Sequence, residues 1–270
     1  MDTSLRHRVN AGREAVKNQL RFFRQQFGAV LSEWKSDDTR VTFADFAISE
    51  KVFKELRQSF PEDHFCSEES NPSDEVIQLS SRYSWVLDPI DGTNNYALGI
   101  AFCAISLALL KDGEPVFGLI YDFSRDELIQ GGPGFGIQRG NGPWRLPAAA
   151  PLEERSAVVG AHFPFPPEHL PALAPLLGRF RLRSFGSGAL NLAYTALGVL
   201  DGCIDFKVKV WDIAAAVALI RTTDRQLFFM DAQPFPLREF HAEAPTIRYI
   251  AGSPAFVDWM RLNCPLPQGT

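Results

Sequence analysis

Residues 85–96 read WVLDPIDGTNNY, an apolar run that ends in two aspartates, a glycine and a threonine. The run, which begins at Tyr83 and stops at a proline, predicts a buried β-strand. Asp91 can cap a helix that begins after it, because its carboxylate can accept hydrogen bonds from amides just downstream. The amides of Gly92 and Thr93 would then lie at a helix N-terminus, where free N–H groups and the helix dipole favour an anion. The stretch therefore predicts an anion site or, more simply, a turn built of good turn residues.

Asp88 needs a further explanation, because it closes the apolar run three residues before Asp91. An isolated carboxylate at the end of a buried strand is costly. Two carboxylates that lie close together raise each other's pKa unless a cation neutralises them. Hard oxygen ligands suit Mg²⁺, so the pair predicts a magnesium site. The alternative is that Asp88 opens a turn and Asp91 closes it.

Three other segments place acidic residues where a strand is expected to end or a helix to begin. They are FCSEES with Glu68 and Glu69, TFAD with Asp45, and KVWDIAAA with Asp212. Each has a simpler interpretation: a solvated loop for the glutamates, a capping box with Thr42 for Asp45, and an N-cap for Asp212. Together with the first stretch, however, they suggest that acidic side chains from four distant segments meet in one site.

The composition limits the class of protein. The chain has 270 residues, of which 46% are apolar, so it can bury a substantial core. Its net charge of −5 argues against a general nucleic-acid binder.

The cysteines form no CxxC pair, which favours reduced thiols and a cytoplasmic protein. No apolar signal segment begins the chain, and the longest apolar run, Ile100–Leu110, is too short to span a membrane. The five histidines show no paired metal spacing, so each is expected on the surface or in packing.

The first half of the chain shows two helical patterns and then strands. A helix is expected over 2–28, where Gly12 occupies a vacant place in the apolar stripe and lowers the helix propensity. A second helix is expected over about 43–59, with Phe46 among the residues of its apolar side. Strands follow at 64–67 and 83–88, and the pair Asp112–Gly113 predicts a β-hairpin.

A cluster of proline and alanine at 147–151 predicts a boundary between two halves of the chain. The N-terminal α+β half would be 1–146 and the C-terminal α/β half 147–270. The second half alternates strands and helices, which indicates a layered α/β arrangement. Its expected strands are 156–162, 180–185, 201–208, 226–231 and 247–253, and its expected helices are 167–177, 188–200 and 211–223.

The motifs DPIDGTNNY, SEES and WDIAAA resemble those of the inositol monophosphatase family, the Mg²⁺-dependent, lithium-sensitive sugar phosphatases. The resemblance runs from KSDDTRVTFAD at 35–45 through RSFGSGALNLAYTALGVLDG at 183–202 to WDIAAA at 211–216. It implies a mixed α/β (α+β) fold, a layered α/β/α/β/α sandwich of the sugar phosphatase type, with the site in the cleft between the halves. It also implies a homodimer.

The resemblance assigns the metal ligands residue by residue. Glu68 and Asp88, with the backbone carbonyl of Ile90, would hold one Mg²⁺. Asp88, Asp91 and Asp212 would hold a second, and the family implies two or three ions in each site. This second site is also the reason for expecting inhibition by lithium.

The resemblance also assigns catalytic and substrate-binding residues. Asp45, Glu68 and Thr93 would be catalytic, with Asp45 and Thr93 paired to orient the attacking water. The amides of Gly92 and Thr93 would bind the phosphate, and Asp205 lies where the family often places a glutamate that contacts the substrate. The expected substrate-binding residues are Asp91, Gly92, Thr93, Asp205 and Asp212.

The implied activity is the hydrolysis of a small phosphate monoester by a metal-activated water, with inositol monophosphate as the leading substrate. Other substrates of the same scaffold remain open: fructose 1,6-bisphosphate, histidinol phosphate and 3′-phosphoadenosine nucleotides. The pocket walls, expected at 161–166, 184–191 and 205–224, would decide among them. A non-catalytic binding protein is the third possibility. Asp205 is one methylene shorter than glutamate, and after Ala216 the sequence departs from the family pattern as VALIRTTDRQLFF. That segment could reshape the pocket wall or simply end its helix differently.

Overall fold

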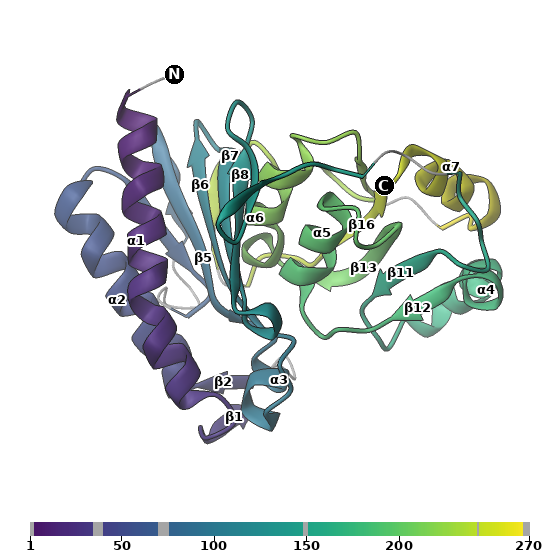
Figure 1. Cartoon of the computed structure of the whole chain (residues 1–270), viewed down its shortest axis with the longest axis horizontal. Coiled ribbons are helices and arrows are strands. Elements are labelled where there is room, and N and C mark those ends of the chain that lie inside the picture. The colour runs from purple at the N-terminus through teal and green to yellow at the C-terminus, as the bar shows by residue number, and fades with distance from the viewer. Residues whose placement is uncertain (1–2, 35–39, 70–75, 148–150, 242, 267–270) are drawn as a thin grey trace.

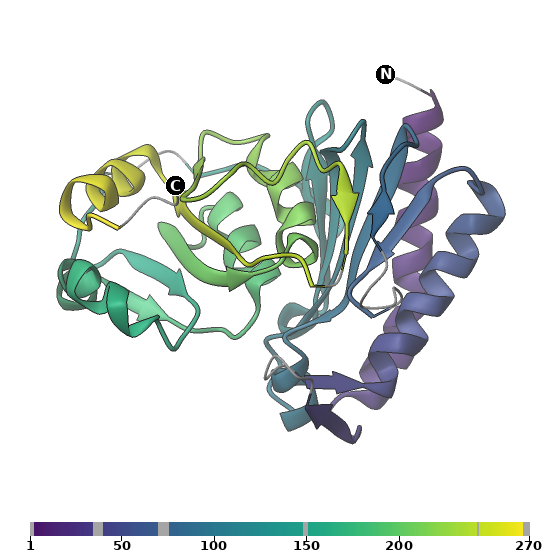
Figure 2. The same ribbon diagram turned by 180° about the vertical axis from the view of Figure 1, so that it is seen from behind.

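The fold is a stack of five layers (Figure 1). The computed structural model describes residues 3–34, 40–69, 76–147, 151–241 and 243–266. Helices α1 (Thr3–Gln26) and α2 (Phe43–Ser59) cover one face of a seven-stranded sheet. Helices α5 (Gly188–Ala196) and α6 (Val210–Ile220) lie between this sheet and a five-stranded one, whose far face carries α4 (Leu170–Arg179) and α7 (Pro254–Asn263) (Figure 2). The predicted α/β/α/β/α sandwich is confirmed.

The seven-stranded sheet supplies two of the acidic segments. Its order is β10-β9-β8-β7-β6-β5-β3, antiparallel except for the parallel pair of β3 and β5. In that pair Ser67 lies opposite Leu87, so the strands bring Glu68 and Asp88 to the same edge. The hairpin expected at Asp112–Gly113 joins β6 to β7. The strands are β3 (His64–Ser67), β5 (Tyr83–Asp91), β6 (Ala104–Lys111), β7 (Glu114–Asp122), β8 (Glu127–Gly132), β9 (Gly136–Arg139) and β10 (Gly142–Trp144).

The first helix packs closely on this sheet. Val16 and Phe23 of α1 are fully buried in an apolar cluster that includes Trp85 of β5. A Cβ added at Gly12 would lie 2.8 Å from the Trp85 ring. The glycine that lowers the helix propensity is therefore the residue that allows this close contact.

The second helix has the bounds expected from the sequence, but its buried face differs. Phe46, expected among the apolar contacts, is 50% exposed. Two polar residues are buried instead: Asp45, and Ser49, whose hydroxyl lies 2.8 Å from that of Ser67. The pattern of apolar residues predicts that such polar positions face solvent. In the structure the two polar residues face inward, toward the residues they contact.

The central helices are apolar on nearly all sides because they contact both sheets. Every residue of α6 except Asp212 is buried. At Gly118 of β7 a Cβ would lie 2.0 Å from the carbonyl oxygen of Ala215, so the helix backbone touches the sheet there. The two sheets therefore share one apolar core to which both halves of the chain contribute.

The five-stranded sheet has the order β12-β11-β13-β16-β14. β11 is parallel to β12 and β13, whereas β16 is antiparallel to β13 and β14. The chain passes from the first sheet to the second between Trp144 and Val158, and the boundary at 146/147 stays a prediction. The strands are β11 (Val158–Ala161), β12 (Arg181–Arg183), β13 (Gly202–Val208), β14 (Gln226–Phe229) and β16 (Ile247–Gly252).

Several elements were not predicted. Helix α7 begins with Ser253 as N-cap and Pro254 as its first residue, a pattern typical of a helix start. The other unpredicted elements are short: β1 (Ser32–Trp34), β2 (Arg40–Thr42), β4 (Ile77–Gln78) and β15 (Glu239–Phe240). No helix among the described residues is long and apolar enough to cross a membrane. All four cysteines are free and buried, as expected from the sequence.

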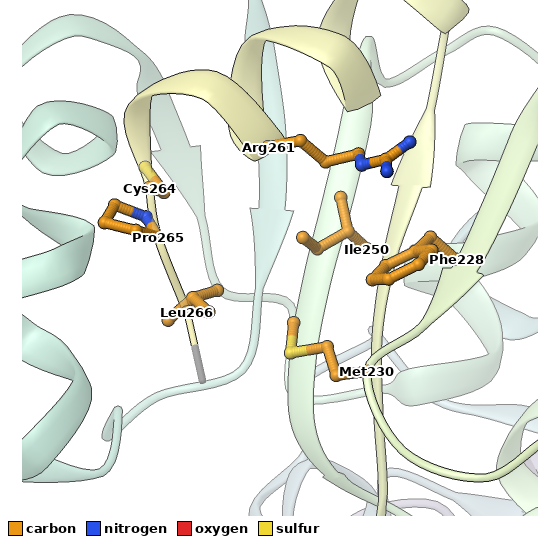
Figure 3. Close-up of a pocket in the computed structure, with 7 residues that line it drawn as sticks. All are labelled: Phe228, Met230, Ile250, Arg261, Cys264, Pro265 and Leu266. Carbon is orange, nitrogen blue, oxygen red and sulfur yellow. The ribbon is translucent and has the colours of Figure 1, made fainter. Parts of the chain in front are cut away.

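A cavity of about 210 Å³ lies between β14, β16 and the end of α7 (Figure 3). Its lining is mostly apolar, with Arg261 as the charged member. None of the acidic residues singled out from the sequence lines it, so it is separate from the site described next.

Candidate active site

Strand β5 continues past the proline at which the sequence predicts it to end. It runs to Asp91, and its pairing with β6 shifts register between Asp88 and Asp91. A register shift of this kind bends a strand and re-aims its side chains. Oδ1 of Asp88 accepts a hydrogen bond from the Ile90 N–H at 3.0 Å, and both residues are buried. The first predicted metal ligand is thus fixed in the interior at the end of a strand.

Asp91 is bound by a helix, but not by the one that follows it. Its carboxylate accepts hydrogen bonds from the N–H groups of Gly188 and Ala189 at 3.0 and 3.1 Å and from the hydroxyl of Ser187, the N-cap of α5. The expectation that Asp91 caps the next helix is wrong, because that helix, α3 (Thr93–Leu98), starts from Gly92 without a side-chain cap. Local sequence could not show that a helix 97 residues away begins opposite β5.

Asp212 reaches the same place from α6. It is the third residue of the helix and accepts the Lys209 N–H at 2.7 Å, so it is not the N-cap. Carboxylate oxygens of Asp88, Asp91 and Asp212 all lie within 4.8 Å of one another. The structure therefore brings together three predicted metal ligands from both halves of the chain.

Burial and mutual repulsion make negative charge on this cluster costly. Burial raises the pKa of Asp91 to about 6, although its hydrogen bonds oppose the shift. Burial is also the first cause of the raised pKa of Asp88 and of Asp212, and the charge of Glu68 adds to both. Glu68 therefore lies beside the cluster at the end of β3, although it is outside the group that meets within 4.8 Å.

The side chains of the cluster fit a divalent cation such as Mg²⁺. The donors are carboxylate oxygens, which hard cations prefer, and a positive charge would remove the repulsion that raises their pKa. Asp88 and Asp91 are buried whereas Asp212 is partly exposed, so a cation could approach from solvent on the side of α6.

Thr93 lies between this cluster and α2. Its hydroxyl is 2.8 Å from the carbonyl oxygen of Ile90 and 3.3 Å from Oδ1 of Asp45, so one proton serves two acceptors. Oδ2 of Asp45 accepts the N–H and the hydroxyl of Thr42 at 2.8 and 2.6 Å. Asp45 therefore forms the capping box with Thr42 and also pairs with Thr93, as the two interpretations of its role expect.

Gly92 occupies a position that only glycine fits. Its φ is +84°, and an added Cβ would lie 2.9 Å from the carbonyl oxygen of Gly186 and 3.0 Å from that of Phe102. Asn95 binds the same two backbone segments, because its Nδ2 donates hydrogen bonds to the carbonyl oxygens of Phe102 and Phe185 at 2.7 and 2.6 Å. The turn after β5 is therefore held tightly against the segment that leads into α5.

Asp205 is buried beneath a histidine that the sequence argument assigned to the surface or to packing. Oδ1 of Asp205 accepts the Lys207 N–H at 2.9 Å, and Oδ2 lies 3.5 Å from Nδ1 of His162. His162 is 37% exposed, which agrees with the surface position expected for it. It also has a charged partner: Asp205, with help from Asp212 and Asp91, raises the pKa of its ring against the effect of burial. His162 and Ser187 lie in segments expected to form the pocket wall, 161–166 and 184–191, but the sequence did not single out either residue. Their contacts with Asp205 and Asp91 depend on the order of the strands and helices.

Comparison with known proteins agrees with the geometry. The sequence model of the inositol monophosphatase family matches residues 2–248. The chain belongs to the inositol monophosphatase family. An inositol-1-monophosphatase of Mesorhizobium japonicum is 32% identical over 229 residues, which are 79% of this chain and 82% of that protein. A Pasteurella multocida protein named Nus factor SuhB is 32% identical over 193 residues, or 69% of this chain and 70% of that protein.

Solved structures of the inositol monophosphatase family share the architecture. The extragenic suppressor protein suhB from Bartonella henselae has a TM-score of 0.79 at 26% identity and covers 97% of this chain, with 98% of its own length matched. A staphylococcal inositol monophosphatase-1 in a lithium chloride-soaked inhibitory complex has a TM-score of 0.80, with 96% of this chain and 95% of that one covered. At 21% identity the latter shows the fold alone.

The segment that departs from the family pattern after Ala216 lies away from the acidic cluster. Helix α6 continues to Ile220, and Arg221 pairs with Glu114 at 2.8 Å. At 1.5 Å per residue, Arg221 is about 13 Å beyond Asp212 along the helix. Arg221 therefore does not form the wall beside the cluster, and α6 ends one residue before it.

Proposed function

We propose that this chain is a Mg²⁺-dependent phosphomonoesterase that releases phosphate from a small phosphorylated alcohol, with inositol monophosphate as the leading substrate. The observation that carries the proposal is the meeting of Asp88, Asp91 and Asp212 within 4.8 Å, directly before the turn at Gly92 and Thr93. Membership of the inositol monophosphatase family supports the reaction class. The Mesorhizobium relative named inositol-1-monophosphatase supports the leading substrate.

Two overlapping sets of oxygen ligands would hold the cations. Glu68, Asp88 and the carbonyl of Ile90 would hold one Mg²⁺, and Asp88, Asp91 and Asp212 would hold a second. When bound, such cations polarise a phosphoryl oxygen and make a water easier to deprotonate. In that state these carboxylates would be ionised, because the positive charge offsets the burial and repulsion that raise their pKa.

Thr93 and Asp45 would orient the attacking water. Asp45 is anchored at one oxygen by Thr42, so its other oxygen keeps a fixed position 3.3 Å from the Thr93 hydroxyl. The proton of that hydroxyl faces Asp45 or the Ile90 carbonyl, which leaves the Thr93 oxygen free to accept a hydrogen bond from water. Glu68, at the end of β3, would assist in orienting this water.

The turn after β5 would bind the phosphate. The first N–H groups of a helix have no partner within the helix, and here they belong to the segment that begins at Gly92 and Thr93. Asp91 and Asp212 would line the same pocket, and Asp205 would lie toward the alcohol portion of the substrate. These assignments follow the family positions.

Other substrates and a non-catalytic role are the alternatives. Fructose 1,6-bisphosphate, histidinol phosphate and 3′-phosphoadenosine nucleotides are phosphate esters that the same scaffold could take. Some relatives are named Nus factor SuhB. A binding role without turnover is therefore the second alternative to test. A homodimer and a cytoplasmic location remain expectations from the sequence.

The test is phosphate release from a panel of inositol, sugar and nucleotide monophosphates with and without Mg²⁺. The variant Glu68→Gln is expected to lower kcat by about 10²–10³, which is the typical effect of removing one strong electrostatic stabiliser. Glu69→Gln, which neutralises the adjacent acid, is the matched control and is expected to keep most of the activity. Absence of Mg²⁺-dependent release from every ester would refute the proposal.

A further inference from the structure

The oxygen of Asp205 that a substrate would need is covered. The side chain of Asp205 is 1% exposed, and its Oδ1 is already bound to the Lys207 N–H. Its Oδ2 is buried and has no hydrogen-bond partner among the described residues. Opposite it, at 3.5 Å, lies Nδ1 of His162, which is also buried and has no other partner in the described chain. A buried carboxylate without a partner is costly, so these two groups are best explained as holding each other.

His162 stands where ligands commonly bind in a sheet of this kind. Ala161, the last residue of β11, lies opposite Ile204 of the parallel strand β13. His162 therefore follows the carboxyl end of β11 and lies beside Asp205, which is within β13. Ligands of open α/β sheets bind outside such carboxyl ends. Strand β11 also packs against α5, whose first N–H groups bind Asp91, because a Cβ added at Gly160 would lie 3.0 Å from Oδ1 of Asn191. The negative charges of Asp91 and Asp212 act on the ring as well.

The exposed part of the His162 side chain does not include Nδ1. The side chain is 37% exposed although its Nδ1 is buried against Asp205. Because the two nitrogens point to different sides of the ring, anchoring Nδ1 leaves Nε2 to face away from Asp205. A substrate in the site would therefore contact His162 and not the covered carboxylate of Asp205.

We propose that the Nε2 edge of His162 binds a hydroxyl group on the alcohol portion of the substrate, and that Asp205 positions the ring. The proposal rests on the phosphatase function and names the class of alcohol: one that carries a hydroxyl near the ester oxygen. A carboxylate only accepts hydrogen bonds, whereas an imidazole anchored through Nδ1–H accepts at Nε2, and its protonated form donates there. A hydroxyl group can form a hydrogen bond with either form of the ring, because it both donates and accepts.

Two pairs of esters isolate the hydroxyl contact. They are inositol 1-phosphate against cyclohexyl phosphate, and glycerol 2-phosphate against isopropyl phosphate, each pair sharing a carbon skeleton. The ratio of kcat/KM within a pair measures recognition of hydroxyl groups. The wild-type enzyme with Mg²⁺ is expected to favour the hydroxylated member by about tenfold or more, because 1.4 kcal/mol corresponds to a factor of ten.

Three variants separate contact from positioning. His162→Asn keeps a polar group near Nδ1 but is too short to replace Nε2, and it is expected to abolish most of the preference while changing the rate on the hydroxyl-free ester by no more than about twofold. His162→Gln reaches the position of Nε2 and is expected to keep part of the preference. Asp205→Asn is expected to reduce the preference, and the double variant with His162→Asn should lose no more than His162→Asn alone.

The outcomes distinguish this inference from the proposed function. If the wild-type enzyme hydrolyses no ester of these pairs and none of the wider panel, the phosphatase proposal fails. If it hydrolyses other esters but none of these pairs, the phosphatase proposal stands and this inference is refuted. If it hydrolyses the pairs and His162→Asn lowers both members equally, His162 is structural and the inference is refuted. Nitrogen-15 spectra of histidine-labelled protein, with the resonances assigned through His162→Gln, give a readout independent of turnover. Free inositol should shift Nε2 of His162, and unchanged resonances at saturating inositol would refute the contact.

Discussion

Asp91 in the first sheet is bound by Gly188 at the start of α5, through a hydrogen bond of 3.0 Å from the Gly188 N–H to the carboxylate. The N-terminus of α5 therefore belongs to the acidic site, because its free N–H groups and its dipole stabilise the negative charge of Asp91. The same contact joins the end of β5 to a helix that packs against the second sheet. The acidic cluster thus depends on correct assembly of both sheets.

The cluster predicts that the cation-free protein loses stability as the pH rises. A carboxyl group whose pKa is higher in the folded than in the unfolded chain stabilises the fold below its unfolded pKa and loses this contribution as the pH rises through its folded pKa. The pKa of Asp91 rises from 3.8 to about 6, and those of Asp88 and Asp212 shift in the same direction. At about 1.4 kcal/mol per pKa unit, Asp91 alone contributes on the order of 3 kcal/mol.

Urea unfolding in the presence of a chelator, at several pH values from 4 to 8, measures this effect. The free energy of unfolding is expected to fall across that range and to fall less in Asp91→Asn, which cannot ionise. Saturating Mg²⁺ should raise the stability most at the high end of the range, because the cation binds the ionised cluster. Equal pH dependence in the variant and the wild type would show that Asp91 titrates normally.

The hydroxyl of Thr93 is expected to matter for turnover rather than for binding. Thr93→Val removes the group that links Asp45 to the Ile90 carbonyl and keeps the shape of the side chain. We expect kcat to fall by about 10²-fold, since positioning and proton-transfer groups typically contribute 10²–10⁴, with KM little changed. Thr93→Ser keeps the hydroxyl and should retain most of kcat. A valine variant as active as the serine variant would remove Thr93 from the mechanism.

Gly92 can be compared with another glycine of the same backbone conformation. Gly92→Ala would place a Cβ 2.9 Å from the Gly186 carbonyl oxygen at a φ of +84°, whereas Gly134 has a φ of +81° with nothing within 4 Å of an added Cβ. Both variants bear the strain of a left-handed alanine, about 1–2 kcal/mol. Only Gly92→Ala should lose more than this in thermal unfolding and also lose phosphate release. Equal losses of stability in the two variants would mean that the close approach at Gly92 is unimportant.

Much of the fold could be predicted because its patterns are local. The bounds of α2 and β3 follow from residues 43–59 and 64–67 alone, and the turn pair Asp112–Gly113 defines the hairpin. The buried face of α2 is predicted wrongly at Phe46, because the helix packs its polar residues inward: Asp45 contacts Thr93, and Ser49 contacts Ser67. Local patterns give elements, whereas tertiary contacts decide which polar side chains are buried.

The acidic cluster could be predicted because four segments carried the same kind of residue at element ends. The partners of those acids could not be predicted in the same way. Ser187 is a glycine-flanked serine with no distinguishing neighbour, and His162 is one of five unremarkable histidines. Both acquire a role only from the placement of α5 against β5 and of β11 beside β13.

Lithium is expected to inhibit the enzyme at millimolar concentration. Li⁺ is a hard cation that prefers oxygen ligands, as Mg²⁺ does, and it would compete for the site formed by Asp88, Asp91 and Asp212. The measurement is phosphate release at fixed Mg²⁺ with increasing lithium chloride, with sodium chloride at the same ionic strength as the control. Activity that responds equally to both salts would indicate screening and not occupation of this site.

Gly12 should be intolerant of alanine although it lies inside a helix. Alanine usually stabilises a helix interior by about 1 kcal/mol relative to glycine, but at Gly12 its Cβ would lie 2.8 Å from the ring of Trp85. That ring cannot easily yield, because its Nε1 donates to Asp63 at 3.0 Å and Asp63 is held by Arg8. Overpacking of this kind costs about 1–3 kcal/mol, so Gly12→Ala should lower the free energy of unfolding.

Gly178 in α4 is the matched control for this prediction. Nothing lies within 4 Å of a Cβ added there, so Gly178→Ala should raise the free energy of unfolding by up to about 1 kcal/mol. Urea unfolding of the two variants should therefore shift the midpoint in opposite directions. A rise in stability for both would show that Trp85 can move aside, and that the glycine in the stripe of α1 is not required for packing against the sheet.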